Sequence, residues 1–191
     1  DTATTFVWGW TASLFAAAVL GPDVFSLNVP VPGEVARLAS DLARTMPSAT
    51  PRERGEHSMV AKRLATDDRP PAVVEARARE LLADEPAFAV RIAGVDWFEE
   101  PTSGPGPVVY FAVESPGLRA LHERLCEAFD TVPDVEGDDY TPHVTIARGG
   151  DREAARRLLD REIEPIEWVV DELAFYDAER NLESGRVALG R

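Results

Sequence analysis

The chain repeats one order of secondary-structure elements twice, and this repeat restricts its possible folds more than any other feature. Hydrophobic periodicity predicts strand, helix, strand, helix, strand in each half. The first strands, residues 25–31 and 107–114, are offset by 82 residues (107 − 25). Such a duplication predicts two similar lobes related by a pseudo-two-fold axis. We therefore expect an α+β fold with duplicated β-α-β-α-β lobes, in which two antiparallel sheets face a central groove and the helices lie outside.

Local signals set the expected boundaries of these elements. Ser115 before Pro116, and Asp151 before an amphipathic run, are typical helix N-caps. The expected helices are residues 34–46, 72–85, 117–129 and 152–161. The expected strands are residues 25–31, 57–65, 87–95, 107–114, 141–148, 166–175 and 186–189.

The domain is expected to cover residues 24–191, with intertwined lobes at roughly 24–98 and 107–191. Residues 1–23 are interpreted as an apolar appendage. Their apolar run, residues 6–20, is shorter than the ~20 residues that span a bilayer. It also lacks the basic start of a signal peptide. We expect a cytoplasmic monomer without a membrane contact, and a membrane or secretory role for this appendage is the alternative.

The net charge of −14 opposes general binding of nucleic acid, which normally rests on a basic surface. A strongly acidic surface is also typical of proteins adapted to a salty cytosol, where screening shortens electrostatic repulsion. A site that binds one terminal phosphate needs only a local group of cations. The chain has 19 Arg and one Lys, and that lysine, Lys62, stands five residues after His57.

Two of the three histidines occupy matching places in the repeat. His57 and His143 each begin the third element of their half, and they are 86 residues apart (143 − 57). Two imidazoles that converge from symmetric strands suit general acid–base chemistry near neutral pH. The third histidine, His122, lies in an expected helix without a repeat partner and is interpreted as structural. Cys126, the single cysteine, is interpreted as a buried apolar residue rather than a nucleophile.

Strand geometry decides which neighbours can join these histidines. Alternation along a strand places Thr145 on the same face as His143 and Arg148 on the opposite face. Arg148 can therefore reach the site only from the strand end or through a bulge, although its guanidinium suits bidentate phosphate recognition. In the first half, Lys62 takes the corresponding sixth place.

The paired histidine motifs resemble those of the 2H phosphoesterase superfamily, and within it the RNA 2′,3′-cyclic phosphodiesterases, also called 2′-5′ RNA ligases. That family carries His-x-Thr/Ser-x twice. Residues 141–148, Thr-Pro-His-Val-Thr-Ile-Ala-Arg, match the second copy, and the resemblance covers roughly residues 24–191. The first copy departs from the pattern, because Met59 replaces the Thr or Ser and the hydroxyl lies one place earlier at Ser58.

The resemblance implies hydrolysis of RNA 2′,3′-cyclic phosphate ends to 2′-phosphates, with reversible 2′-5′ RNA ligation as a side activity. It implies His57 as proton donor and His143 as proton acceptor, although symmetry leaves the two roles exchangeable. The phosphate-binding candidates are Thr145, Ser58, Lys62 and Arg148. No metal and no cofactor are expected. The expected partner is an RNA with a 2′,3′-cyclic phosphate end, such as a tRNA half or an oligonucleotide, or a cyclic nucleotide.

Two alternatives remain open. Met59 favours a binding module that holds RNA ends without turnover, because a hydroxyl donor is missing from one motif. The other alternative is an enzyme that opens a small-molecule cyclic phosphate derived from ADP-ribose.

Overall fold

The computed structural model describes residues 24–52, 57–66 and 69–190, so the expected appendage 1–23 lies outside the described residues. The helices are α2 (Gly33–Ala43), α3 (Pro71–Leu82), α4 (Pro116–Ala128) and α5 (Arg152–Leu159), with a short 3-10 helix, η1 (Gly137–Asp139). The strands are β1 (Val24–Pro30), β2 (Thr50–Pro51), β3 (Ser58–Ala65), β4 (Phe88–Phe98), β5 (Val108–Glu114), β6 (His143–Arg148), β7 (Ile166–Val170), β8 (Glu172–Asp177) and β9 (Leu182–Ala188).

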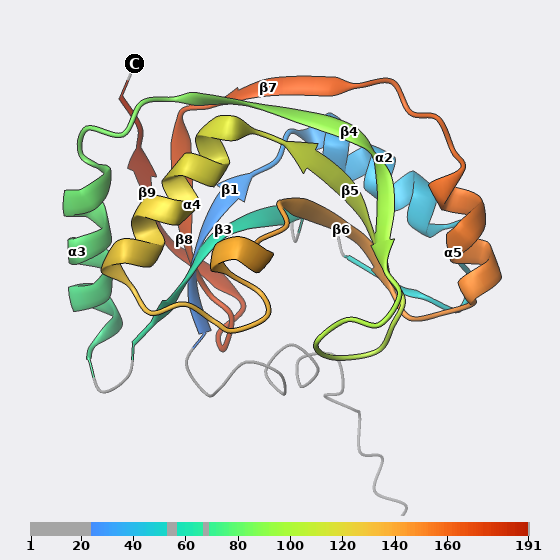
Figure 1. The fold of residues 1–191 in the computed structure, drawn as a ribbon, viewed down its shortest axis with the longest axis horizontal. Helices are drawn as coiled ribbons and strands as arrows, with labels where there is room; N and C mark the ends of the chain where they lie inside the picture. Colours follow the sequence, from blue (N-terminus) through green and yellow to red (C-terminus); the bar gives the residue numbers. More distant parts are fainter. Residues whose placement is uncertain (1–23, 53–56, 67–68, 191) are drawn as a thin grey trace, which may run out of the picture.

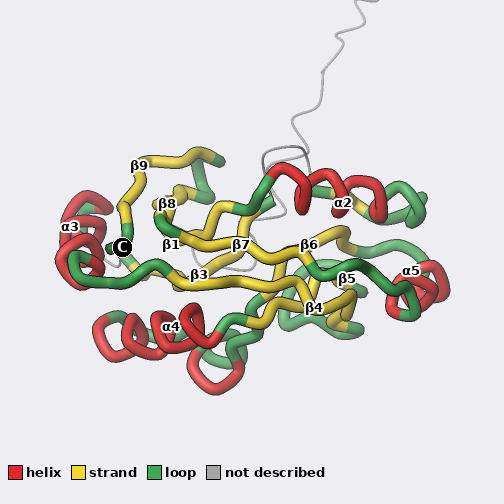
Figure 2. Tube along the Cα trace, turned by 90° about the horizontal axis from the view of Figure 1, so that it is seen from above, coloured by secondary structure: helices red, strands yellow, loops and turns green. Residues whose placement is uncertain are grey.

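The strands form two antiparallel sheets, as expected from the duplicated pattern (Figure 1). A four-stranded sheet has the order β3-β1-β8-β9, and a five-stranded sheet has the order β2-β6-β5-β4-β7. Figure 2 shows the four helices at the periphery with the strands between them. The α+β class and the outer position of the helices are therefore confirmed. None of the helices within the described ranges is long and apolar enough to cross a membrane.

The two expected N-caps form in the structure. The Ser115 side chain accepts from the Leu118 backbone N–H at 3.1 Å and donates to the Ala89 carbonyl at 2.6 Å. Asp151 accepts from two backbone N–H groups of α5. Because these side chains satisfy backbone donors that a helix end leaves without partners, the local sequence determines where α4 and α5 begin.

The C-terminal strand region differs from the prediction. Residues 166–175 are two strands rather than one, since β7 pairs with β4 while β8 pairs with β1 in the other sheet. The chain changes sheets at Asp171, between the last residue of β7 and the first of β8. The expected strand 186–189 is longer in the structure and runs over Leu182–Ala188. The two-residue strand β2 lies in a region that was expected to be a loop.

Each sheet also combines strands from both halves of the repeat. β4 belongs to the first half but pairs with β5 and β7 of the second half. In return, β8 of the second half pairs with β1 of the first. β3 and β6, which are far apart in the chain and belong to different sheets, are also in contact.

Candidate active site

A β-bulge on β6 brings three predicted site residues to one face of the five-stranded sheet. Directly paired residues of neighbouring strands point to the same side. His143 pairs with Ala112 and Thr145 with Tyr110, whereas Arg148 pairs with Val108 because Ile146 is an extra residue without a partner. Ala112, Tyr110 and Val108 alternate along β5 and share a face. The bulge therefore reverses the parity that would have turned Arg148 away from the two others.

This face is turned away from α5. Arg156 of α5 lies over the ring of Trp97, with 5.6 Å from its guanidinium carbon to the ring centroid. Trp97 pairs with Val109, which pairs with Ala147, so these three residues share a face. Val109 lies between Val108 and Tyr110 on β5, so this face is opposite to that of His143, and it is the face that α5 covers. His143 and Arg148 are partly exposed, and Thr145 is 9% exposed.

The imidazole of His143 is held in one orientation and tautomer. Its Nδ1 lies 2.7 Å from the Thr141 carbonyl oxygen. A carbonyl oxygen can only accept, so Nδ1 carries the proton and Nε2 is the acceptor of the neutral ring. The ring meets Phe98 edge-on at 5.2 Å and lies 5.1 Å from the Tyr110 ring, measured between centroids.

His143 is poised as a neutral base. Its pKa is lowered to about 4: burial is the main cause, the charges of Arg63, Arg148 and Arg52 add to it, and the hydrogen bond to Thr141 opposes both. Both causes disfavour the imidazolium form. At neutral pH the ring is therefore uncharged, and Nε2 can take a proton.

The charges of three arginines, Arg52, Arg63 and Arg148, act on His143. The backbone N–H of Arg52 donates to the carbonyl of the bulge residue Ile146 at 3.5 Å. Arg148 donates from Nη1 to the Ser103 carbonyl at 3.4 Å. Burial lowers the pKa of Arg148, and the nearby charges of Arg52 and Arg63 lower it too. Cations that disfavour each other's charge form a site that favours an anion.

The first half carries a matching bulge on β3. Ser58 pairs with Pro30, Val60 with Asn28 and Arg63 with Ser26, while Ala61 is the extra residue. Pro30, Asn28 and Ser26 alternate along β1, so Ser58, Val60 and Arg63 share one face. The side chains of Met59 and Lys62 belong to the other face, with Val29 and Leu27 of β1.

The two motifs can be aligned on their bulges instead of on their histidines, and the equivalent positions then differ by one residue. The bulges lie 85 residues apart (146 − 61), which makes Ser58 the counterpart of His143 (143 − 58) and Arg63 that of Arg148 (148 − 63). His57 stands one residue before β3, so strand alternation does not determine the direction of its side chain. The structure places His57 7% exposed at this strand end.

Ser58 has a polar neighbour on its own face. Asn28 donates from Nδ2 to Ser58 Oγ at 3.2 Å, which leaves the Ser58 hydroxyl hydrogen available to a ligand. Asn28 Oδ1 is buried and has no hydrogen-bond partner within the part of the chain that the structure describes.

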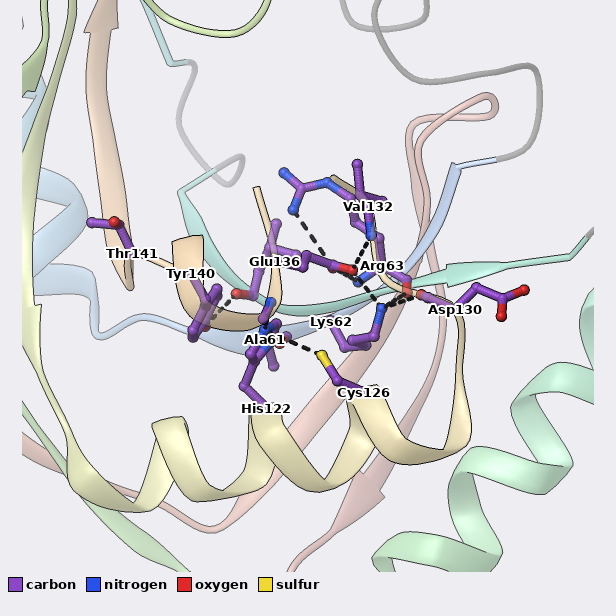
Figure 3. Close-up of polar contacts among 12 residues, drawn as sticks. Ala61, Lys62, Arg63, His122, Cys126, Asp130, Val132, Glu136, Tyr140 and Thr141 are labelled. Atoms are coloured by element: carbon purple, nitrogen blue, oxygen red, sulfur yellow. Dashed lines mark hydrogen bonds and ion pairs between the residues drawn. The ribbon is translucent and has the colours of Figure 1, made fainter. Parts of the chain in front are cut away.

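Lys62 does not reach this face. Its side chain is fully buried, and Nζ donates to the carbonyls of Arg63 (2.9 Å) and Asp130 (2.7 Å) and to Glu136 Oε2 (2.5 Å) (Figure 3). An ammonium has three donors, and all three are used. The expectation that Lys62 contacts a phosphate therefore has no free donor to support it. The bulge at Ala61 is the physical reason, because it turns Lys62 away and Arg63 towards the face of Ser58.

Glu136 joins the loop before β6 to the edge strand β3. Its Oε1 accepts from the Arg63 backbone N–H at 2.7 Å, and Oε2 accepts from the Val132 N–H at 3.0 Å as well as from Lys62. The Arg63 guanidinium lies 3.7 Å from Oε1. An edge strand exposes backbone groups that must find partners, and this loop supplies them.

His122 and Tyr140 complete the cover of β3. His122 donates from Nδ1 to the Ala61 carbonyl (2.8 Å), and its Nε2 accepts from the Gly137 N–H (3.0 Å). The Tyr140 hydroxyl donates to the Val60 carbonyl at 2.7 Å, and its ring stacks on His122 at 3.7 Å. Burial lowers the pKa of His122, so the ring is neutral and structural. Cys126 Sγ lies 3.3 Å from His122 Nε2 (Figure 3), and burial raises its pKa, which does not suit a nucleophile.

Sequence reasoning missed Arg52 and Arg63. Arg63 follows directly after the lysine that was chosen, so a bulge at the same place in both strands was the signal that could have identified it. Arg52 depends on β2, which is too short to predict. Within residues 24–52, 57–66 and 69–190, no three His, Cys, Asp or Glu side chains are grouped so that they could hold a metal ion.

A sequence profile described as the 2′-5′ RNA ligase superfamily matches residues 57–182, which is about two thirds of the chain and includes both motif histidines. Comparison with curated protein sequences found no match.

Solved structures share the fold. TT0787 of Thermus thermophilus is 19% identical with a TM-score of 0.57, and the match covers 88% of this chain and 99% of that one. The apo form of E. coli LigT is 15% identical with a TM-score of 0.56, covering 88% and 98%. LigT complexed with 3′-AMP is 17% identical with a TM-score of 0.55, covering 89% and 99%.

Proposed function

The chain belongs to the 2′-5′ RNA ligase superfamily of 2H phosphoesterases, and we propose that it hydrolyses RNA 2′,3′-cyclic phosphate ends to 2′-phosphates. The observation that carries the proposal is the neutral His143 with Nε2 as acceptor, on one face with Thr145 and Arg148. A structure of LigT contains 3′-AMP, which supports a nucleotide-like ligand for this chain as well. Ligation would open the same cyclic phosphate with the 5′ hydroxyl of a second RNA in place of water, which forms a 2′-5′ linkage and frees the 3′ hydroxyl.

In the proposed reaction, His143 Nε2 takes a proton from the water that attacks phosphorus. The bond between phosphorus and the 3′ oxygen breaks, and His57 delivers a proton to that oxygen. The products are a 2′-phosphate and a free 3′ hydroxyl. General acid–base catalysis of this kind typically contributes 10²–10⁴-fold to a rate, on the order of 3–5 kcal/mol.

The remaining groups stabilise charge on the phosphate. The Thr145 hydroxyl and the Arg148 guanidinium share the His143 face and can donate to the non-bridging oxygens. Ser58 offers its hydroxyl hydrogen from the other strand, since its oxygen already accepts from Asn28. A phosphate that binds here partly neutralises the arginines and raises the pKa of His143 when the ring must take a proton.

Hydrolysis of 2′,3′-cyclic AMP and of an RNA with a 2′,3′-cyclic phosphate end tests the proposal. We expect the wild-type protein to form only the 2′-phosphate and H143A to lose at least about 100-fold in rate. R157Q is a matched surface control, because Arg157 on α5 pairs only with Glu153 of the same helix among the described residues. An H143A rate close to wild type would refute the role of His143.

A non-catalytic binding module is the second candidate, and one observation favours it. By register, Ser58 and Val60 stand where the other half has His143 and Thr145, so the first strand repeats neither the histidine nor the threonine. Single-turnover cleavage separates the two functions. Stoichiometric binding of the cyclic nucleotide without product would support the module and exclude the hydrolase.

A further inference from the structure

Arg63 occupies the place in the first half that Arg148 occupies in the second. Each arginine is the second residue after a bulge residue, Ala61 or Ile146, and each lies on the face of its sheet that carries the motif's polar side chains. β3 and β6 are in contact, although they belong to different sheets. The charge of Arg63 also acts on both His143 and Arg148, which shows that the two strands bring these groups close together.

The opposite face of β3 is covered. Arg79 of α3 lies over the Phe175 ring at 4.9 Å, Phe175 pairs with Leu27, and Leu27 pairs with Lys62. α3 therefore packs on the side of Lys62, and Arg63 points away from that helix. The Arg63 side chain is 20% exposed, whereas those of Lys62 and Glu136 are 0% exposed.

Glu136 positions Arg63 and shares its negative charge between Arg63 and Lys62. The carboxylate accepts from Lys62 at 2.5 Å, so its nearest counter-charge is the lysine. The Arg63 guanidinium is 3.7 Å from Glu136 Oε1, beyond hydrogen-bond distance, and its backbone N–H is tied to that oxygen at 2.7 Å. Lys62, Glu136 and Arg63 together carry one net positive charge, and among the described residues the Arg63 guanidinium makes no contact to a carboxylate closer than this 3.7 Å ion pair. Donors of the guanidinium can therefore turn to a ligand.

We propose that Arg63 is the phosphate-binding residue of the first half of the site, and that the buried Lys62–Glu136 pair holds it in place. The inference rests on the proposed function and deepens it. Arg63 and Arg148 approach a terminal phosphate from two neighbouring strands, and each can form a bidentate contact to its oxygens. This contact replaces the hydroxyl that the first motif lacks at Met59.

Binding of inorganic phosphate and of adenosine 2′-monophosphate, measured by isothermal titration calorimetry, tests this role without turnover. We expect R63Q to weaken the binding of both ligands by about 10-fold or more, the effect of losing one charge-assisted contact. R157Q makes the same change in net charge on α5 and should bind both ligands like the wild type. R63K keeps the charge but loses the bidentate geometry, so its affinity should lie between those of wild type and R63Q.

The outcomes separate this inference from the proposed function. If R63Q binds both ligands as tightly as R157Q does, the inference is wrong, whatever the enzyme hydrolyses. If wild type fails to open 2′,3′-cyclic AMP but R63Q still binds phosphate more weakly, the proposed function fails and the anion site stands. Thermal unfolding of R63Q and R63K should match that of wild type, because the backbone contact to Glu136 remains in both. If R63Q does not fold, R63K becomes the deciding variant. An affinity of R63K for both ligands equal to that of wild type would then overturn the role of Arg63.

Discussion

His143 should remain uncharged down to about pH 4, although a histidine in an unfolded chain takes up its proton near pH 6.5. Burial is the main cause, and the charges of Arg63, Arg148 and Arg52 add to it. The folded protein therefore binds no proton at this ring in a pH window where the unfolded chain does. A depression of 2.5 pKa units (6.5 − 4) corresponds to ~3 kcal/mol of differential interaction.

The sign of the stability effect follows from proton linkage. The contribution of His143 is fully present above pH 6.5 and is lost as the pH falls towards 4, because the unfolded chain binds the additional proton. Glutamine in its place cannot titrate. Urea unfolding between pH 7.5 and pH 4 should therefore show that wild type loses about 3 kcal/mol more than H143Q. Equal losses in the two proteins would show that partial burial and the neighbouring arginines do not lower the pKa of His143.

NMR titration of the imidazole carbons measures the same quantity directly. H143Q identifies the signal of His143 among the three histidines of the chain. R52Q should shift its midpoint upwards, since one of the three cations is removed. The acid limb of kcat/KM should follow the free-enzyme base, so activity should persist well below pH 6.5. A His143 midpoint near 6.5 would mean that neither burial nor the arginines act as described.

Three further predictions concern the site and its support. T145V keeps the shape of a buried residue but removes the hydroxyl. The kcat for 2′,3′-cyclic AMP should therefore fall by on the order of 10²-fold, while unfolding in urea stays unchanged. An unaffected kcat would exclude Thr145 from the site. K62M leaves the buried Glu136 without its nearest counter-charge. The free energy of unfolding in urea should therefore fall by about 3–5 kcal/mol. A loss below about 1 kcal/mol would show that the pair is not buried as described. Hydrolysis should be insensitive to EDTA, because each proposed step uses side chains of the chain alone; inhibition that added Mg²⁺ or Zn²⁺ reverses would contradict this.

Much of the fold could be predicted because its signals are local. Ser115 and Asp151 satisfy backbone N–H groups within their own helices, so both helix starts follow from neighbouring residues. The repeat of strands and helices predicted the two sheets, since burial of an apolar face imposes a period that the sequence must carry. His143 and Thr145 could be placed on one face for the same reason, because no bulge intervenes between them.

The remainder depends on which strand pairs with which. The separation of β7 from β8 at Asp171 follows from partners more than 70 residues away in the chain, so residues 166–175 by themselves predict one strand. The choice between two cations of the first motif depends on strand pairing in the same way. Lys62 and Arg63 are adjacent cations, and only the pairing of β3 with β1 decides which of them faces Ser58.

The sequence by itself determined the duplicated α+β architecture, the helix caps and the His143 motif, because periodicity and capping act over a few residues. Only the tertiary structure decided the cations of the site. One extra residue at Ala61 and one at Ile146 reverse the alternation of β3 and β6. Arg63 therefore shares a face with Ser58, and Arg148 shares one with His143, while Lys62 pairs with Glu136 in the interior. A β-bulge forms where one of two paired strands has an extra residue, and this depends on which distant segments pair with each other.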